Sequence, residues 1–117
     1  MIRVLVCGGR HYQDWRNVYR ALNEIDSEFG VEVVIEGECP FGGADLFAKN
    51  WAELHGKTLL PFAAERDASG KFLGPQRNSR MIQEGKPDVV LAFPGGTGTA
   101  DCVRKAKRRK ILVIEVQ

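Results

Sequence analysis

The chain has 117 residues, which fits one folded domain (1–117) and leaves no room for a second independent core. Its formal net charge of +2 neither demands nor excludes nucleic acid as a partner. No apolar run approaches the ~20 residues of a membrane span, and the amino terminus lacks a signal-peptide pattern. Three cysteines without a CxxC pair argue against a disulfide framework. We therefore expect a reduced, cytoplasmic protein without a membrane partner.

Five short apolar runs predict the strands of a parallel sheet. They are continuous rather than alternating, which is typical of strands buried on both faces beneath helices. The predicted strands are residues 2–7, 31–35, 58–62, 89–93 and 111–116.

Helical periodicity fills the segments between these strands. Apolar residues recur at three- and four-residue steps in each, and glycines close the first two. The predicted helices are 15–29, with Phe29 in its apolar stripe, 44–54, with Leu46 and Leu54, about 76–84 and about 99–108. The alternation predicts an α/β class, a Rossmann-like three-layer domain with a five-stranded parallel sheet and about four helices.

Segment 63–74 shows neither strand nor helix periodicity, and it is long for a connection in so small a domain. Such loops are either functional lids or mobile segments, and both interpretations stay open.

Glycines gather after three of the predicted strands. In an open α/β sheet, ligands bind beyond the carboxyl ends of the strands, where helix amino termini converge. The strongest signal is the turn 94–99, Pro-Gly-Gly-Thr-Gly-Thr, because glycines let backbone N–H groups approach a phosphate at a helix start. We expect Thr97 or Thr99 to cap that helix. A tight turn without a ligand would not explain a double glycine followed by a third.

The turn Gly8-Gly9-Arg10 is less specific. It lacks the GxGxxG spacing and the later acidic residue of a dinucleotide site, and the chain has no Walker A motif. NAD binding and P-loop phosphoryl transfer are therefore disfavoured, and we expect no cofactor.

One helix supplies a candidate anion ligand. Arg77 shares an inward face with Met81, four residues on, and its planar fork of donors suits a phosphate. Arg80 is spaced to pair with Glu84, which favours a structural role.

Several carboxylates lie near the predicted site. Asp101 follows the 94–99 turn; it either simply stabilises its helix start and pairs with Lys105, or acts as a base or ribose ligand. Asp45, Glu36 and Glu38 are second-rank candidates.

The three cysteines, Cys7, Cys39 and Cys102, map to the same edge of the sheet. Buried thiols beside tight turns are commoner than a three-thiolate site, and no histidine is spaced to complete one, so we expect no metal. His11 can enter the pocket, whereas His55 suits a helix carboxyl end. The basic run 104–110 also lies at a helix end and lacks aromatics for base stacking. Nucleic acid is therefore possible but not favoured.

Together these motifs resemble the SLOG superfamily, Rossmann-like domains that include the Lonely Guy phosphoribohydrolases and the DNA-processing protein A domain, and most of all its small YspA-type family. The resemblance is carried by Val-Cys-Gly-Gly-Arg at 6–10, Gly-Gly-Ala-Asp at 42–45, Gly-Pro-Gln-Arg-Asn at 74–78 and Ala-Phe-Pro-Gly-Gly-Thr-Gly-Thr-Ala-Asp at 92–101. Lonely Guy enzymes carry a PGGxGTxxE loop, and here Cys102 occupies the glutamate position. Asp101 is turned by about 100° from that position on a helix.

The resemblance implies a nucleotide or nucleotide-derived ligand, bound by a sensor or a nucleotide-processing protein. Two alternatives remain: a phosphoribohydrolase-like enzyme that cleaves the N-glycosidic bond of nucleoside monophosphates, and a single-stranded nucleic-acid binder. Relatives often dimerise, which implies a homo-oligomer. The candidate catalytic residues are Arg77 and Asp101. The candidate ligand residues are Gly8, Gly9, Arg10, Gly42, Gly43, Asp45, Arg77, Asn78, Gly95, Gly96, Thr97, Gly98 and Thr99.

Overall fold

A computed structural model describes all residues, 1–117, and confirms the predicted α/β fold. Strands and helices alternate in chain order: β1 (Ile2–Cys7), α1 (Trp15–Phe29), β2 (Val31–Glu36), α2 (Ala44–Leu54), β3 (Thr58–Pro61), α3 (Gly74–Gly85), β4 (Val89–Ala92), α4 (Thr97–Arg108) and β5 (Leu112–Glu115).

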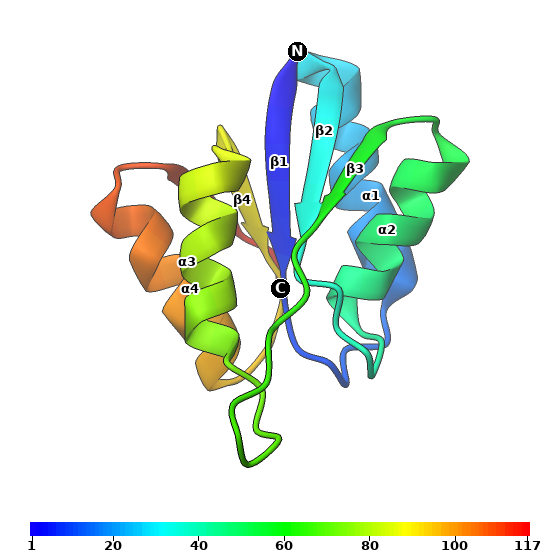
Figure 1. The fold of residues 1–117 in the computed structure, drawn as a ribbon. Coiled ribbons are helices and arrows are strands. Elements are labelled where there is room, and N and C mark those ends of the chain that lie inside the picture. The colour runs from blue at the N-terminus through cyan, green and yellow to red at the C-terminus, as the bar shows by residue number, and fades with distance from the viewer.

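The five strands form one parallel sheet in the order β3-β2-β1-β4-β5. Strand β1 is central, and its Val4 pairs with Val34 of β2 and Val89 of β4. The order reverses direction after β3, so α1 and α2 pack on one face and α3 and α4 on the other (Figure 1). The carboxyl ends of β1, β2 and β4, and the loops that follow them, therefore meet at one edge.

Burial along the strands divides the sheet into a core and two edges. Strands β1, β2 and β4 are almost wholly buried, as their continuous apolar runs predict. Strands β3 and β5 are partly exposed, with Leu112 and Ile114 open to solvent. The prediction that every strand is buried on both faces was therefore wrong for these two, which form the two edges of the sheet.

The helices differ from their predictions mainly at their starts. Helix α3 begins at Gly74, with Pro75 in its first turn, a position where the missing N–H of proline removes no helical bond. Helix α4 begins at Thr97, two residues before the predicted start. The expected apolar stripes were too wide, because Phe29, Leu46 and Leu54 are exposed.

The segment between β3 and α3 extends below the sheet edge (Figure 1). It is folded as a tight turn, in which Arg66 and Phe72 form an antiparallel bridge and Leu73 N–H donates to Glu65 O at 2.7 Å. Asp67 Oδ1 accepts hydrogen bonds across the tip of this turn. No helix combines the length and apolar character that crossing a bilayer requires.

Candidate functional site

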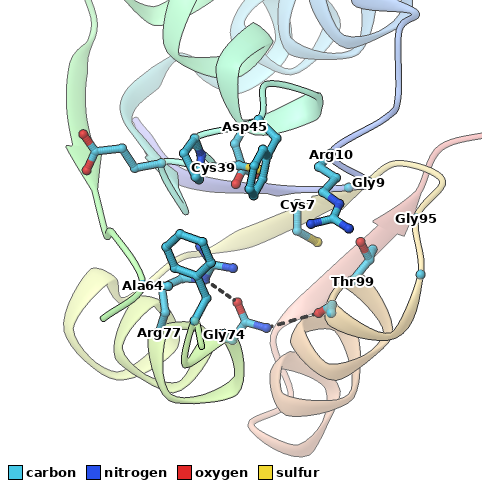
Figure 2. Close-up of a pocket in the computed structure, with 18 of the residues that line it drawn as sticks. Cys7, Gly9, Arg10, Cys39, Asp45, Ala64, Gly74, Arg77, Gly95 and Thr99 are labelled. Carbon is cyan, nitrogen blue, oxygen red and sulfur yellow. Dashed lines mark hydrogen bonds between the residues drawn. The ribbon is translucent and has the colours of Figure 1, made fainter. Parts of the chain in front are cut away.

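A cavity of about 930 Å³ opens at the carboxyl edge of the sheet. Figure 2 shows side chains around it from several segments, with Arg77 on the α3 side, Asp45 opposite, and Arg10 and Thr99 nearer α4. Most of the predicted ligand residues line this cavity: Gly8, Gly9, Arg10, Asp45, Arg77, Asn78, Gly95, Gly96, Thr97, Gly98 and Thr99. Gly42, Gly43 and Asp101 are not among the lining residues.

The turn after β4 lines this cavity and carries a row of unpaired backbone donors. The first main-chain bond of α4 runs from Ala100 N–H to Gly96 O, and none of the five N–H groups of residues 95–99 donates to a protein acceptor. Gly96 occupies the position before the helix, and no side chain caps it. The expected cap from Thr97 or Thr99 is therefore absent. The donors that a threonine would have satisfied remain available at the positive end of the helix.

Close packing of two loops shapes this turn. Gly9 N–H donates to Pro94 O at 2.9 Å, and a side chain at Gly95 would overlap Thr99 Oγ1 and lie 2.7 Å from Gly9 N. Gly43 has a φ of +78° and lies against the Gly9 carbonyl, so glycine is required there too. Gly43 thus brings α2 close to the β1 loop without lining the cavity itself.

Arg77 lies at the cavity wall with part of its donor set unused. Its Nη1 donates to Gly37 O at 2.5 Å and its Nε to Asn78 Oδ1 at 2.9 Å, while Nη2 has no acceptor in the protein. These two bonds hold the guanidinium in place, and they leave Nη2 available for an anion.

Asn78 links Arg77 to α4. Its amide donates to Gly98 O and to Asp101 Oδ2, both at 3.1 Å. Asp101 also pairs with Arg104 at 2.5 Å and Lys105 at 2.9 Å. Burial opposes ionisation of Asp101, but the hydrogen bonds from Lys105 and Asn78 outweigh it and hold its pKa below the usual value. Asp101 therefore contacts Asn78, which positions Arg77, and does not line the cavity.

Two buried carboxyl groups lie on the α2 side. Burial raises the pKa of Asp45 to about 6, against the opposing effects of Arg77 and of the Cys39 and Gly37 N–H groups. Asp45 Oδ2 lies 3.0 Å from where a Gly37 side chain would start, beside the Arg77 guanidinium. Burial likewise raises the pKa of Glu36 to about 7. Glu36 Oε1 accepts from Glu38 N–H at 2.8 Å, while its buried Oε2 has no partner.

The cysteines separate into two kinds. Cys7 and Cys39 line the cavity, whereas Cys102 is buried in α4 beside Cys7. A hydrogen bond with the Cys102 thiol, together with burial, raises the pKa of Cys7 well above its usual value. No three or more His, Cys, Asp or Glu side chains are arranged to hold a metal ion.

Arg80 and the basic run 104–110 make contacts within the fold. Arg80 does not pair with Glu84 as its spacing suggests; it donates to Ala63 O at 2.7 Å and lies over Phe62, so it anchors the start of the 63–73 segment. Within the basic run, Lys107 pairs with Glu115 across to β5, at 3.7 Å.

Sequence reasoning did not single out the aromatic part of the cavity wall. Phe41, Arg66 and Phe72 line it, the first from the β2–α2 loop and the other two from the 63–73 segment. The only sequence signal was the unusual length of that segment. His11, which was expected to enter the pocket, is also a lining residue.

A comparison with protein families identifies the family to which this chain belongs. The model of the family YAcAr, described as the YspA, cpYpsA-related SLOG family, matches residues 2–68, more than half of the chain. The chain belongs to this SLOG family. The match confirms the family resemblance, and it covers the β1 and β2 loops of the site, while Arg77 and the turn 94–99 lie beyond the matched residues.

A solved structure supports the SLOG chain's Rossmann-like architecture. The chain is similar to UDP-N-acetylglucosamine 2-epimerase from Rickettsia bellii, with a TM-score of 0.56 and 20% sequence identity over 98% of this chain. The chain spans only 30% of the epimerase's length, so the likeness concerns the fold alone. No curated protein matches the sequence.

Proposed function

We propose that this SLOG domain binds a phosphorylated nucleotide or nucleotide-derived ligand, with the phosphate on the first turn of α4. The observation that carries the proposal is that residues 95–99, whose N–H groups have no protein acceptor, line the same cavity as Arg77, whose Nη2 also has none. Backbone donors at a helix start and a guanidinium together suit a phosphate.

The size and charge of the cavity support the same ligand class. Its volume of about 930 Å³ lies within the roughly 300–1,000 Å³ of small-molecule sites. Three lining arginines, Arg10, Arg66 and Arg77, form no ion pair with a carboxylate. The lining carboxyl groups are Glu38 and Asp45, and neither forms an ion pair with these arginines. The three arginines outnumber the two carboxyl groups, so the charge of the cavity wall favours an anionic ligand.

A thermal-shift panel tests the proposal with ribose 5-phosphate, nucleoside monophosphates and unphosphorylated nucleosides. Ligand at a hundred times its Kd should stabilise the fold by about 2.7 kcal/mol through mass action. We expect phosphorylated compounds to raise Tm more than the matching nucleosides, and Arg77→Ala to abolish the difference. Arg108→Ala is the matched control, because Arg108 is an exposed arginine that forms no ion pair and does not line the cavity. Equal shifts for Arg77→Ala and the parent, or no shift with any phosphate at millimolar concentration, would refute the proposal.

A second candidate function is hydrolysis of the N-glycosidic bond of a nucleoside monophosphate. The observation that favours it is Asp45, a buried cavity carboxyl group with a pKa of about 6, beside the guanidinium of Arg77. A carboxylate supports an oxocarbenium-like centre or accepts a proton from water, and the guanidinium stabilises negative charge. In this scheme Asp45 takes the role that Asp101 cannot reach from its pairing with Asn78.

Incubation with nucleoside monophosphates at high protein concentration tests this activity by release of the free base. We expect Asp45→Asn to abolish release while still binding the nucleotide, and Glu38→Gln to serve as the control for a lining carboxylate outside this pairing. Absence of release by the parent protein, or full activity of Asp45→Asn, would eliminate this candidate and leave ligand binding as the function.

A further inference from the structure

Two aromatic rings meet at the cavity wall. Phe41 follows β2 and Phe72 precedes α3, and their ring centroids lie 6.2 Å apart at 88°. Phe41 is 60% exposed, although it is a large apolar side chain. An exposed aromatic ring inside a ligand cavity offers apolar area that a ligand can cover.

Each ring carries a guanidinium that has no carboxylate partner. The Arg10 guanidinium carbon lies 5.1 Å from the Phe41 centroid, and that of Arg66 lies 4.3 Å from the Phe72 centroid. Neither arginine forms an ion pair. No ion pair therefore fixes either guanidinium over its ring, and guanidinium planes also stack on other planar aromatic groups.

These four side chains form a continuous row across three loops. Arg10 comes from the β1–α1 loop, Phe41 from the β2–α2 loop, and Arg66 and Phe72 from the segment before α3. The antiparallel bridge between Arg66 and Phe72 holds the last pair in place. All four residues line the cavity that also contains the 95–99 turn.

We propose that this row, Arg10–Phe41–Phe72–Arg66, binds the planar base of the ligand by stacking. The inference rests on the proposed function, and it adds to the phosphate site a separate surface that binds the aromatic base of the ligand. Stacking uses the face of a base and not its edge, so several bases should be accepted, and the larger purines should bind more tightly than pyrimidines. In this proposal, the segment 63–73 forms one wall of the base subsite.

Calorimetric titration with AMP, ribose 5-phosphate and adenosine separates the two ends of the ligand. We expect the parent protein to bind AMP at least tenfold more tightly than ribose 5-phosphate. Phe41→Leu should weaken AMP about tenfold, equivalent to about 1.4 kcal/mol, and leave ribose 5-phosphate unchanged. Phe41→Trp should restore AMP binding, because it returns an aromatic face. Phe29→Leu is the matched control, since Phe29 is also an exposed phenylalanine and does not line the cavity.

The outcomes distinguish the base subsite from the phosphate site. Equal affinity of the parent for AMP and ribose 5-phosphate, or an equal loss of both in Phe41→Leu, overturns the base subsite and leaves phosphate binding standing. Binding of adenosine that depends on Phe41, with no contribution from phosphate, supports the subsite and refutes the phosphate site. If none of the three compounds binds, both proposals fail. Because Phe41 is exposed, an unchanged Tm of Phe41→Leu checks that the fold is intact.

Discussion

The buried carboxyl group of Glu36 should make the stability of the protein fall as pH rises. Burial raises its pKa from 4.5 to about 7, and nearby Asp45 and Glu38 act in the same direction, while the Glu38 N–H and Lys49 oppose them. A carboxyl pKa that is higher in the folded state means that the folded state binds more protons. The stabilisation is therefore complete below pH 4.5 and is lost as pH rises to about 7.

The size of this effect follows from the raised pKa. At about 1.36 kcal/mol per pKa unit, ionised Glu36 lowers the free energy of unfolding by roughly 3 kcal/mol at pH 8. Glu36→Gln keeps the Oε1 acceptor for Glu38 N–H and removes the charge. It also places an amide donor at the unpartnered Oε2 position, which costs about 1 kcal/mol. We therefore expect the variant to be about 2 kcal/mol more stable than the parent at pH 8, and no more stable at pH 5.

Urea unfolding at pH 5, 6, 7 and 8 measures this difference, with the fluorescence of buried Trp51 as one probe and circular dichroism as a second. Glu32→Gln is the matched control, because Glu32 lies on the same strand with its side chain exposed, and its profile should parallel that of the parent. If Glu36→Gln also parallels the parent at every pH, or is less stable at pH 8, then Glu36 is not a buried acid with a raised pKa.

Three further predictions concern the frame of the site and the helices around it. Gly95→Ala should lower Tm by several degrees in thermal unfolding, because the new Cβ overlaps Thr99 Oγ1; an unchanged Tm would show that the turn tolerates a side chain. Asp101→Asn should destabilise the protein by about 1 kcal/mol through loss of partly exposed ion pairs, and should weaken phosphate binding; calorimetry that finds full affinity would contradict its positioning role. Lys57 holds the pKa of Asp26 below its usual value, so that pair stabilises the fold above about pH 4 and its contribution is lost in acid. The free energy of unfolding of Asp26→Asn should therefore fall less steeply with decreasing pH than that of the parent. Identical pH profiles would contradict a stabilising Asp26–Lys57 pair.

A network of hydrogen bonds and ion pairs connects Arg77 to α4. Arg77 faces the cavity, Asn78 holds its Nε, and Asp101 holds Asn78 together with two cations of α4. Two side chains, Asn78 and Asp101, therefore connect α4 to the guanidinium of Arg77. In the proposed function, they connect the helix that offers the backbone donors to the arginine that binds the same phosphate.

The order of the elements follows from the sequence by itself, and the sequence also predicts the sheet edge at which the proposed site lies. Continuous apolar runs, helical periodicity and glycines are local signals, and they predict the strands, the helices and a ligand edge because each depends on near neighbours along the chain. The turn 94–99 and Arg77 were found in this way, and the structure places both on one cavity.

Tertiary structure decided the partners of the side chains, because those partners are distant in the chain. Asp101 could be read from the sequence as a cavity residue or as a helix-stabilising one; only the packing of α3 against α4 directs it to Asn78, 23 residues away. Phe41 and Phe72 meet because the fold brings together two loops that are distant in the chain. Likewise, the groups that surround Glu36 in the folded protein leave its Oε2 without a hydrogen-bond partner. Local patterns carry no information on such contacts, so the sequence predicts the candidate site and the tertiary structure determines which side chains meet there.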